Sequence, residues 1–303
     1  MRNALMAMAL AALLSGCGGG ADDDAGGADG FELDLAVELG QLCLQSYQML
    51  TDFEDGATFT LPAPYTLQAQ YLTPEHYPGE SFSSEVPIAF VATSGSAIYV
   101  VFRGTKTISE WISDATFTQV PYPAVSDGGK TETGFTAIYQ TIDTAIVDEV
   151  NHLAASSAYT TLYVTGHSLG AALATLAAPE LARATRFTAP VLYNFASPRT
   201  GDPTFAALAD ELPSTWRVVN TNDEVPKLPP AVAVVVENDQ PHFFFYEHIE
   251  SEYPITFGVP IHDLEDLEED HAMCNYYSTL CERTTSPATC KQMAGGADGC
   301  NPR

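Results

Sequence analysis

A short segment around Ser168 constrains the fold of this chain more than any other part of its sequence. The apolar, β-branched run 161–164 (TLYV) predicts a strand, and the alanine- and leucine-rich run 171–184 predicts a helix. Between them lies the pattern G-x-S-x-G, with Gly166 and Gly170 two places either side of the serine. Such a turn strains the serine backbone, requires small residues at both glycine positions and holds the hydroxyl at a helix N-terminus. The segment therefore predicts a nucleophilic serine; a tight turn with a capping serine is the alternative.

The patterns on either side place this turn in a chain of alternating strands and helices. Strands are predicted at 88–92, 98–102, 161–164, 191–196 and 216–220, and helices at 33–49, 138–155 and 171–184. Alternating elements of this kind form a mostly parallel sheet with helices on both faces. We therefore expect one α/β domain over residues 31–303.

A serine hydroxyl is a weak nucleophile unless a base takes its proton. On this architecture the chain order is serine, then acid, then histidine. Four histidines follow the predicted acid: His242, His248, His262 and His271. Asp223 follows the strand 216–220 directly and is the expected acid. Asp202 is the rival, but an aspartate before Pro203 at the start of a helical run is better explained as a helix N-cap.

Six segments, in this order, resemble the fungal-type triacylglycerol lipases, also called class 3 lipases. They are 101–105 (VFRGT), 108–114 (ISEWISD), 165–170 (TGHSLG), 197–203 (SPRTGDP), 219–230 (VNTNDEVPKLPP) and 270–276 (DHAMCNY). The resemblance covers about residues 85 to 280. It implies an α/β-hydrolase fold and a serine ester hydrolase that needs no metal or organic cofactor.

The resemblance also implies roles for individual residues. It favours His271 as the base that activates Ser168, with His262 as the runner-up, and Asp223 as the acid that orients the base. The backbone N–H of Leu169 is one expected donor to the oxyanion.

Two further positions are implied by the family alone. Thr105 would be the second oxyanion donor, although it can also be a turn residue that ends a strand. Trp111 is a lid candidate, with a packed helix residue as the equal alternative.

The charge balance limits the partners of such an enzyme. The chain has 39 Asp and Glu against 12 Lys and Arg, a formal net charge of −27. A nucleic-acid partner is excluded, because neutralising phosphates requires clustered cations. A neutral fatty-acyl ester at a lipid–water interface tolerates this charge, and triacylglycerol is the leading substrate. A feruloyl-type esterase, a phospholipase and an acyltransferase are the alternatives, and a non-catalytic envelope-binding lipoprotein is the alternative from a different class. We expect a monomer.

The N-terminal sequence is typical of a signal peptide for export. Arg2 and the apolar run 4–14 are followed by LSGC at 14–17, which resembles a bacterial lipoprotein box. Residues 1–16 would be the signal peptide, Cys17 the lipidated residue and 17–30 a Gly- and Asp-rich tether. This predicts a lipid-anchored protein of the bacterial cell envelope; ordinary secretion is the alternative.

The other cysteines fall into two groups. Cys274 and Cys281 are expected to pair with Cys290 and Cys300 in either order, because Cys274 and Cys281 lie too far apart on one helix to bridge. Cys43 is expected to be a buried free thiol. Alternatives are a bond from Cys43 to this C-terminal group, or no bridges at all. The acidic run 263–270 is expected to be a solvated loop rather than a calcium site.

Overall fold

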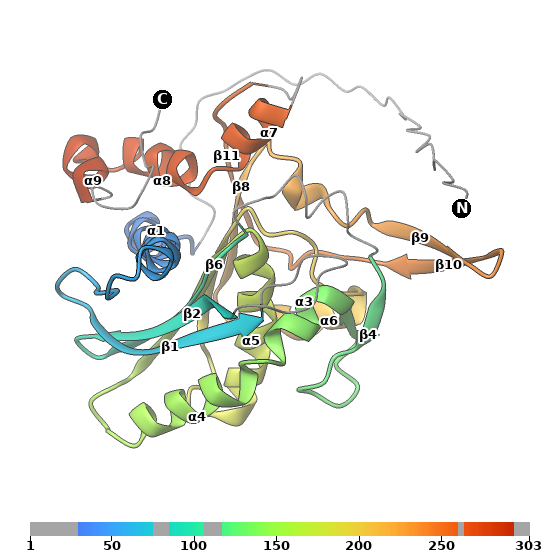
Figure 1. The fold of residues 1–303 in the computed structure, drawn as a ribbon, viewed down its shortest axis with the longest axis horizontal. Coiled ribbons are helices and arrows are strands. Elements are labelled where there is room, and N and C mark those ends of the chain that lie inside the picture. Colours follow the sequence, from blue (N-terminus) through green and yellow to red (C-terminus); the bar gives the residue numbers. More distant parts are fainter. Residues whose placement is uncertain (1–29, 75–84, 106–116, 260–263, 294–303) are drawn as a thin grey trace.

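The fold is built on a mixed sheet (Figure 1). The computed structural model describes residues 30–74, 85–105, 117–259 and 264–293. Within them, seven strands form the sheet in the order β1-β2-β3-β6-β7-β8-β11. Their bounds are β1 Thr66–Pro74, β2 Glu85–Ser94, β3 Ala97–Phe102, β6 Thr161–His167, β7 Val191–Phe195, β8 Thr215–Asn220 and β11 Glu252–Ile255.

The strands from β3 to β11 are parallel, whereas β1, β2 and β3 are antiparallel neighbours. The register places Phe102 beside Gly166 and Gly166 beside Asn194. The carboxyl ends of β3, β6 and β7 therefore meet at one edge, where an open parallel sheet binds its ligands. The mostly parallel single-domain α/β fold is confirmed.

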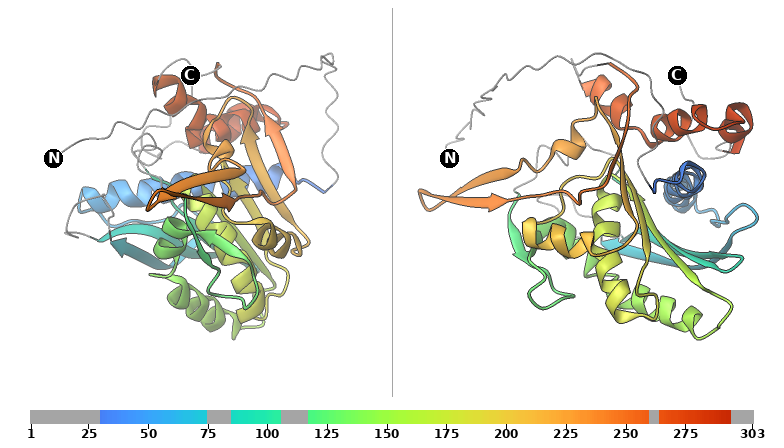
Figure 2. Two further views of the ribbon diagram at one scale, coloured as in Figure 1. Left: turned by 90° about the vertical axis from the view of Figure 1, so that its right-hand side faces the viewer. Right: turned by 180° about the vertical axis from the view of Figure 1, so that it is seen from behind.

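Helices cover both faces of the sheet (Figures 1 and 2). One face carries α3 Thr133–Tyr139, α4 Asp143–Ala154, α5 Leu169–Ala184 and α6 Pro203–Asp210. The other carries α1 Leu33–Glu54 and α8 Met273–Glu282, with α9 Pro287–Met293 beside α8. Along β3, Val100 and Phe102 enter the first core while Tyr99 and Val101 enter the second. Burial on both faces explains why this strand reads as an uninterrupted apolar run.

Two predicted elements were wrong. The single helix expected at 138–155 is divided into α3 and α4, because the Thr141 hydroxyl donates to the Ile138 carbonyl and helps to turn the chain between them. The acidic run forms α7 (Leu264–His271) rather than a loop. In α7, Leu267 is buried together with Asp270 and His271, so one side of this acidic helix faces the protein interior.

Several strands were missed. Exposed and half-buried residues alternate along β1, and Pro254 interrupts the pattern of β11 at the sheet edge. Two short hairpins were missed as well. They are formed by β4 Gln119–Pro121 with β5 Lys130–Glu132, and by β9 Val232–Glu237 with β10 Gln240–Phe245. The β9–β10 hairpin projects from the body of the molecule, on the right of Figure 1 and on the left of the right-hand view in Figure 2.

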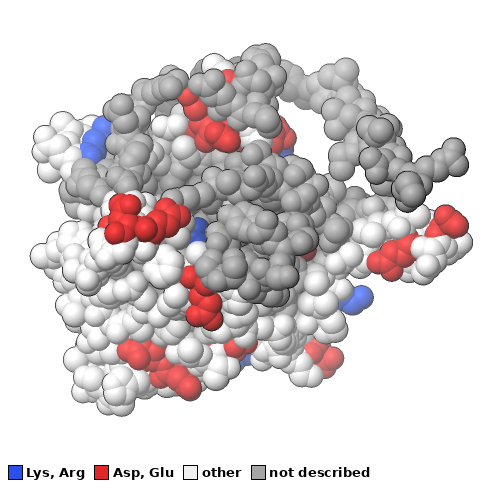
Figure 3. Space-filling model, in the orientation of Figure 1, with Lys and Arg blue, Asp and Glu red and all other residues white. Residues whose placement is uncertain are grey.

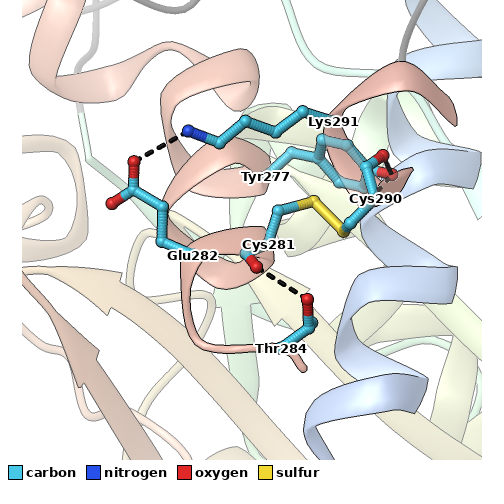
Figure 4. Close-up of a disulfide and its surroundings, with 6 residues drawn as sticks. All are labelled: Tyr277, Cys281, Glu282, Thr284, Cys290 and Lys291. Atoms are coloured by element: carbon cyan, nitrogen blue, oxygen red, sulfur yellow. Dashed lines mark hydrogen bonds and ion pairs between the residues drawn. A yellow bond between two sulfur atoms is a disulfide. The ribbon is translucent and has the colours of Figure 1, made fainter. Parts of the chain in front are cut away.

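The cysteines largely follow the expectation. Cys43 is free and buried, and Cys281 bonds Cys290 between α8 and α9 (Figure 4), one of the two predicted orders. Cys274 is also disulfide-bonded. Cys17 and Cys300 lie outside the described residues. None of the helices described is long and apolar enough to cross a membrane.

Candidate active site

Ser168 lies in a strained turn between β6 and α5. Its φ of 59° and ψ of −127° fall where residues other than glycine are rare. A Cβ on Gly166 would lie 2.2 Å from the Gly170 carbonyl oxygen, and a Cβ on Gly170 would lie 2.3 Å from the Phe102 oxygen. Both positions therefore require glycine, as the pattern predicted. The Ser168 N–H donates to the Phe195 carbonyl at 3.0 Å, which ties the turn to β7.

Asp223 and His271 meet beside this turn although 48 residues separate them. Asp223 follows β8, is fully buried, and its Oδ2 lies 2.8 Å from Nδ1 of His271. Because an ionised carboxylate only accepts hydrogen bonds, Nδ1 carries the proton. Oδ1 of Asp223 accepts from the Val225 N–H at 2.9 Å, so both carboxylate oxygens are occupied. This arrangement fixes the tautomer of His271 and leaves Nε2 with a free lone pair.

Two buried polar atoms at the site have no hydrogen-bond partner among the described residues: the Ser168 hydroxyl oxygen and Nε2 of His271. The serine is 1% exposed and the histidine 4%. A hydroxyl can donate and an unprotonated imidazole nitrogen can accept, so the two groups are chemically complementary. Catalytic hydrogen bonds are often long in an empty site and tighten when substrate binds.

His167 connects the serine turn to the backbone of His271. Its Nε2 lies 2.8 Å from the His271 carbonyl oxygen, so Nε2 donates, and the Tyr47 hydroxyl donates to Nδ1 at 2.6 Å. Burial, aided by the neighbouring His271, lowers the pKa of His167 well below its usual range. His167 is therefore a neutral structural residue that supports the serine turn.

The two expected oxyanion donors lie on adjoining elements. Leu169 begins α5, so its N–H is at a helix N-terminus. Thr105 follows β3, and a Cβ on the preceding Gly104 would lie 3.1 Å from the Ser168 Cβ. The backbone that enters Thr105 thus passes directly against Ser168. Trp111, the lid candidate, lies outside the described residues.

Three residues around Asp223 and His271 were given no role by the sequence. The Tyr276 hydroxyl donates to Oδ2 of Asp223 at 2.8 Å and accepts from the Asn220 N–H at 2.9 Å. Asn220 Nδ2 donates to the Asp270 carbonyl oxygen at 3.0 Å, which ties the end of β8 to the end of α7. Their places in the family-like segments 219–230 and 270–276 were the signal that could have drawn attention to them.

Asp270 stands out among these neighbours. Its side chain is buried, and the backbone N–H of Val259 offsets only part of the cost of burying its negative charge. Burial, together with the nearby acids Asp223, Asp266 and Glu269, raises its pKa to about 6.

The rival residues have structural roles. Asp202 caps α6 by accepting from the Phe205 N–H at 2.9 Å, as expected. His248 Nε2 lies 2.7 Å from the Pro226 carbonyl oxygen, and burial lowers its pKa to about 3. His242 is exposed on β10, and His262 lies outside the described residues. In the part of the chain that the structure describes, no cluster of three or more His, Cys, Asp or Glu side chains forms a metal site.

The mixed sheet, the strained serine turn and the helices on both faces define an α/β-hydrolase fold. Within this fold, residues 99–233 match the family model for Lipase (class 3). A secreted mono- and diacylglycerol lipase from Penicillium cyclopium is 38% identical over 136 residues, 45% of this chain and 44% of the relative. A lipase from Rhizomucor miehei is 37% identical over 198 residues, 62% of this chain and 51% of the relative. Phospholipase A1-II 4 from rice is 36% identical over 161 residues, which are 44% of this chain and 40% of the relative.

Solved structures agree with these matches. An MDLA mutant from Penicillium cyclopium has a TM-score of 0.58 at 27% identity and covers 77% of this chain and 84% of its own. Another match is a triacylglycerol lipase whose catalytic centre is described as a serine protease triad. Its TM-score is 0.56 at 28% identity, and the match covers 72% of this chain and 87% of that lipase. The chain spans about half the length of the curated relatives it matches. Together these findings show that the chain is similar to the class 3 lipases in sequence and in fold.

Proposed function

We propose that this protein is a serine ester hydrolase that acts on fatty-acyl esters, with triacylglycerol and partial acylglycerols as leading substrates. The observation that carries the proposal is the buried hydrogen bond between Asp223 and His271 beside a strained serine turn. A buried acid that fixes a histidine tautomer next to such a serine is the arrangement that acyl transfer requires. The printed names of the fungal relatives, which are lipases, support the substrate class.

In the proposed mechanism, Ser168 is the nucleophile and His271 the base. The Ser168 oxygen attacks the ester carbonyl while its proton passes to Nε2 of His271. Asp223 stabilises the imidazolium that forms, and the N–H groups of Leu169 and Thr105 receive the oxyanion. Nε2 then returns the proton to the departing alcohol, which leaves an acyl-enzyme. Water, deprotonated by the same nitrogen, releases the fatty acid and restores the serine.

The direct test is Ser168→Ala, assayed on p-nitrophenyl esters of short and long chains and on emulsified triacylglycerol. We expect the variant to lose at least about 10³-fold in kcat, because alanine cannot attack the ester carbonyl. Ser278→Ala, another buried serine on α8, is the matched control and should keep wild-type activity. Equal activity of wild type and Ser168→Ala would exclude the mechanism. An inactive wild type would favour the non-catalytic envelope-binding lipoprotein.

A phospholipase is the second candidate, favoured by the match to a rice phospholipase A1. Comparing phosphatidylcholine with triolein at equal surface area separates the two head-group preferences. Adding an alcohol acceptor beside water tests for an acyltransferase, and a methyl ferulate assay tests for a feruloyl-type esterase.

We also propose export, which the secreted fungal relatives support, and lipid anchoring through Cys17. Residues 1–16 would be removed and 17–30 would tether domain 31–303 to the bacterial envelope. Intact mass of the mature N-terminus tests this: an acylated Cys17 is expected, and Cys17→Ser should release the protein from the membrane fraction. An unmodified N-terminus created by cleavage elsewhere would contradict the anchor and favour ordinary secretion.

A further inference from the structure

The β9–β10 hairpin has one face made entirely of apolar side chains. Its register pairs residues in three cross-strand couples: Val232 with Phe245, Val234 with Phe243, and Val236 with Pro241. All six are exposed, and Phe243 is 58% exposed. Five of the eight exposed large hydrophobic side chains among the described residues lie on this face. A patch of this kind on a soluble protein marks an interaction surface.

The opposite face and the base of the hairpin keep this face turned outward. Ala233 on the opposite face is buried, and Tyr246 at the base is buried with its hydroxyl donating to the Thr118 carbonyl at 3.1 Å. Gln119 donates to the Phe245 carbonyl at 2.7 Å. Toward the tip, the opposite face is polar and carries His242. The hairpin is therefore amphipathic, and its hydrogen bonds to Thr118 and Gln119 hold it to the body at its base.

A rigid connection joins the hairpin to the candidate active site. Asp223 accepts from the Val225 N–H, and the short helix η1 (Val225–Lys227) follows at once. The Arg199 side chain donates to the Lys227 and Pro229 carbonyls, and its N–H donates to the Leu228 carbonyl. The chain reaches the first hairpin strand five residues after η1. A surface held by the hairpin is thus placed at a fixed distance from Asp223.

The charge of the hairpin indicates which lipid surfaces it can approach, anionic or uncharged. Residues 229–246 contain no Lys or Arg, and the tip carries Glu237 and Asp239. Acidic side chains gather toward the far end of the hairpin, on the right of the view in Figure 3. With a net charge of −27 on the whole chain, an anionic lipid surface would repel it. A neutral or zwitterionic surface presents no such barrier.

The size of the face argues against a second copy of the chain as the occupant. Two six-residue strands give a footprint of about 20 Å by 10 Å. A stable protein interface buries about 800 Å² from each partner, which this face alone does not supply. Apolar side chains can enter the boundary of a lipid phase without any such minimum.

We propose that the apolar face of the β9–β10 hairpin docks the enzyme onto a neutral or zwitterionic lipid surface. This inference rests on the proposed function, because the same lipid phase would hold the ester substrate. The hairpin then presents the edge of the sheet that carries Asp223 and Ser168 to that phase.

Flotation with phosphatidylcholine vesicles tests the proposal, using the full chain with Cys17→Ser so that no acyl chain contributes. Val234→Thr/Phe243→Thr removes one cross-strand pair but keeps residues that favour strands. It should lower vesicle binding on the order of tenfold or more and leave hydrolysis of soluble p-nitrophenyl acetate unchanged. Phe53→Gln/Leu72→Thr, a matched change at two exposed apolar residues on α1 and β1, should bind as the parent does.

A local probe separates the hairpin from other membrane contacts. An environment-sensitive fluorophore on Phe243→Cys should shift to the blue with phosphatidylcholine vesicles, whereas the same label on Leu72→Cys should not. Unchanged flotation of the hairpin variant, or equal shifts at both labels, overturns the proposal. A concentration-dependent dimer that the hairpin variant dissociates, without vesicle binding, would also overturn it and assign the face to a second copy. Vesicle docking by a wild type that hydrolyses no ester would support the docking surface and reject the proposed function alone.

Discussion

The Tyr276 hydroxyl donates its hydrogen bond to Oδ2 of Asp223, the same carboxylate oxygen that receives Nδ1 of His271. The hydroxyl in turn accepts the Asn220 N–H, so its orientation is set by the end of β8. The Asp223 carboxylate therefore holds His271 from a position that is fixed by two further hydrogen bonds, from the Tyr276 hydroxyl and from the Val225 N–H. Pre-organisation of this kind keeps the imidazole in a single tautomer.

Removing the Tyr276 hydroxyl should weaken this orientation. Tyr276→Phe loses a hydrogen bond to a charged group and leaves the buried Asn220 N–H without its acceptor, so we expect kcat to fall about tenfold to a hundredfold. KM should stay near the wild-type value, because Tyr276 acts through Asp223. Tyr277→Phe, which loses a bond to the Cys290 carbonyl instead, is the control for steady-state kinetics. Equal losses in the two variants would contradict a positioning role.

The choice of Asp223 over Asp202 gives a second prediction. Asp223→Asn should lower kcat about 10⁴-fold, because an amide at this position favours the wrong tautomer of His271. Asp202→Asn keeps an N-cap for α6, so activity and stability should change little. Steady-state hydrolysis and thermal unfolding of both variants decide the point. A large activity loss in Asp202→Asn alone would reverse the assignment.

The buried carboxyl of Asp270 predicts a pH-dependent stability. Its folded pKa of about 6 lies above the ordinary value of 3.8. Protonation of Asp270 is therefore favoured in the folded state. The resulting stabilisation of the fold is fully present below about pH 4 and is lost as the pH rises through 6. Asp270→Asn removes this pH dependence. Between pH 4 and pH 7.5, the free energy of unfolding of the variant should rise relative to that of the wild type by on the order of 2 kcal/mol. Urea unfolding across this range measures the difference, with exposed Glu268→Gln as the control. Parallel curves for wild type and Asp270→Asn would refute it.

The Cys281–Cys290 bond should stabilise the protein without serving catalysis. It closes a short loop between α8 and α9, far in sequence from Ser168 (Figure 4). Cys281→Ala/Cys290→Ala should lower the free energy of unfolding by about 2–3 kcal/mol, with ester hydrolysis at 25 °C retained. The exposed ion pair between Lys291 and Glu282 lies beside the bond. Lys291→Ala therefore serves as the control, and its effect should stay below about 1 kcal/mol. Lost activity in the folded double variant would contradict this separation.

Much of the fold was predictable because it depends on local chemistry. The strand–turn–helix around Ser168 needs glycine on both sides, and the structure shows backbone atoms within 2.3 Å of where those Cβ atoms would lie. The apolar runs of β3 and β6 predicted buried strands, and the segment after β8 predicted the position of Asp223. The hairpin was missed although a signal exists: Asn238 and Asp239, both with positive φ, separate two apolar runs.

The sequence by itself determined the serine turn, the alternation of strands and helices, and the excess of negative charge, because each depends on neighbouring residues or on a simple count. Only the tertiary structure decided that His271, which the family resemblance favoured, meets Asp223, that Tyr276 shares its carboxylate, and that Asp270 is buried close to other acids. These relationships join residues about 50 positions apart. They depend on α7 and α8 packing against the end of β8, a long-range arrangement that no local pattern encodes.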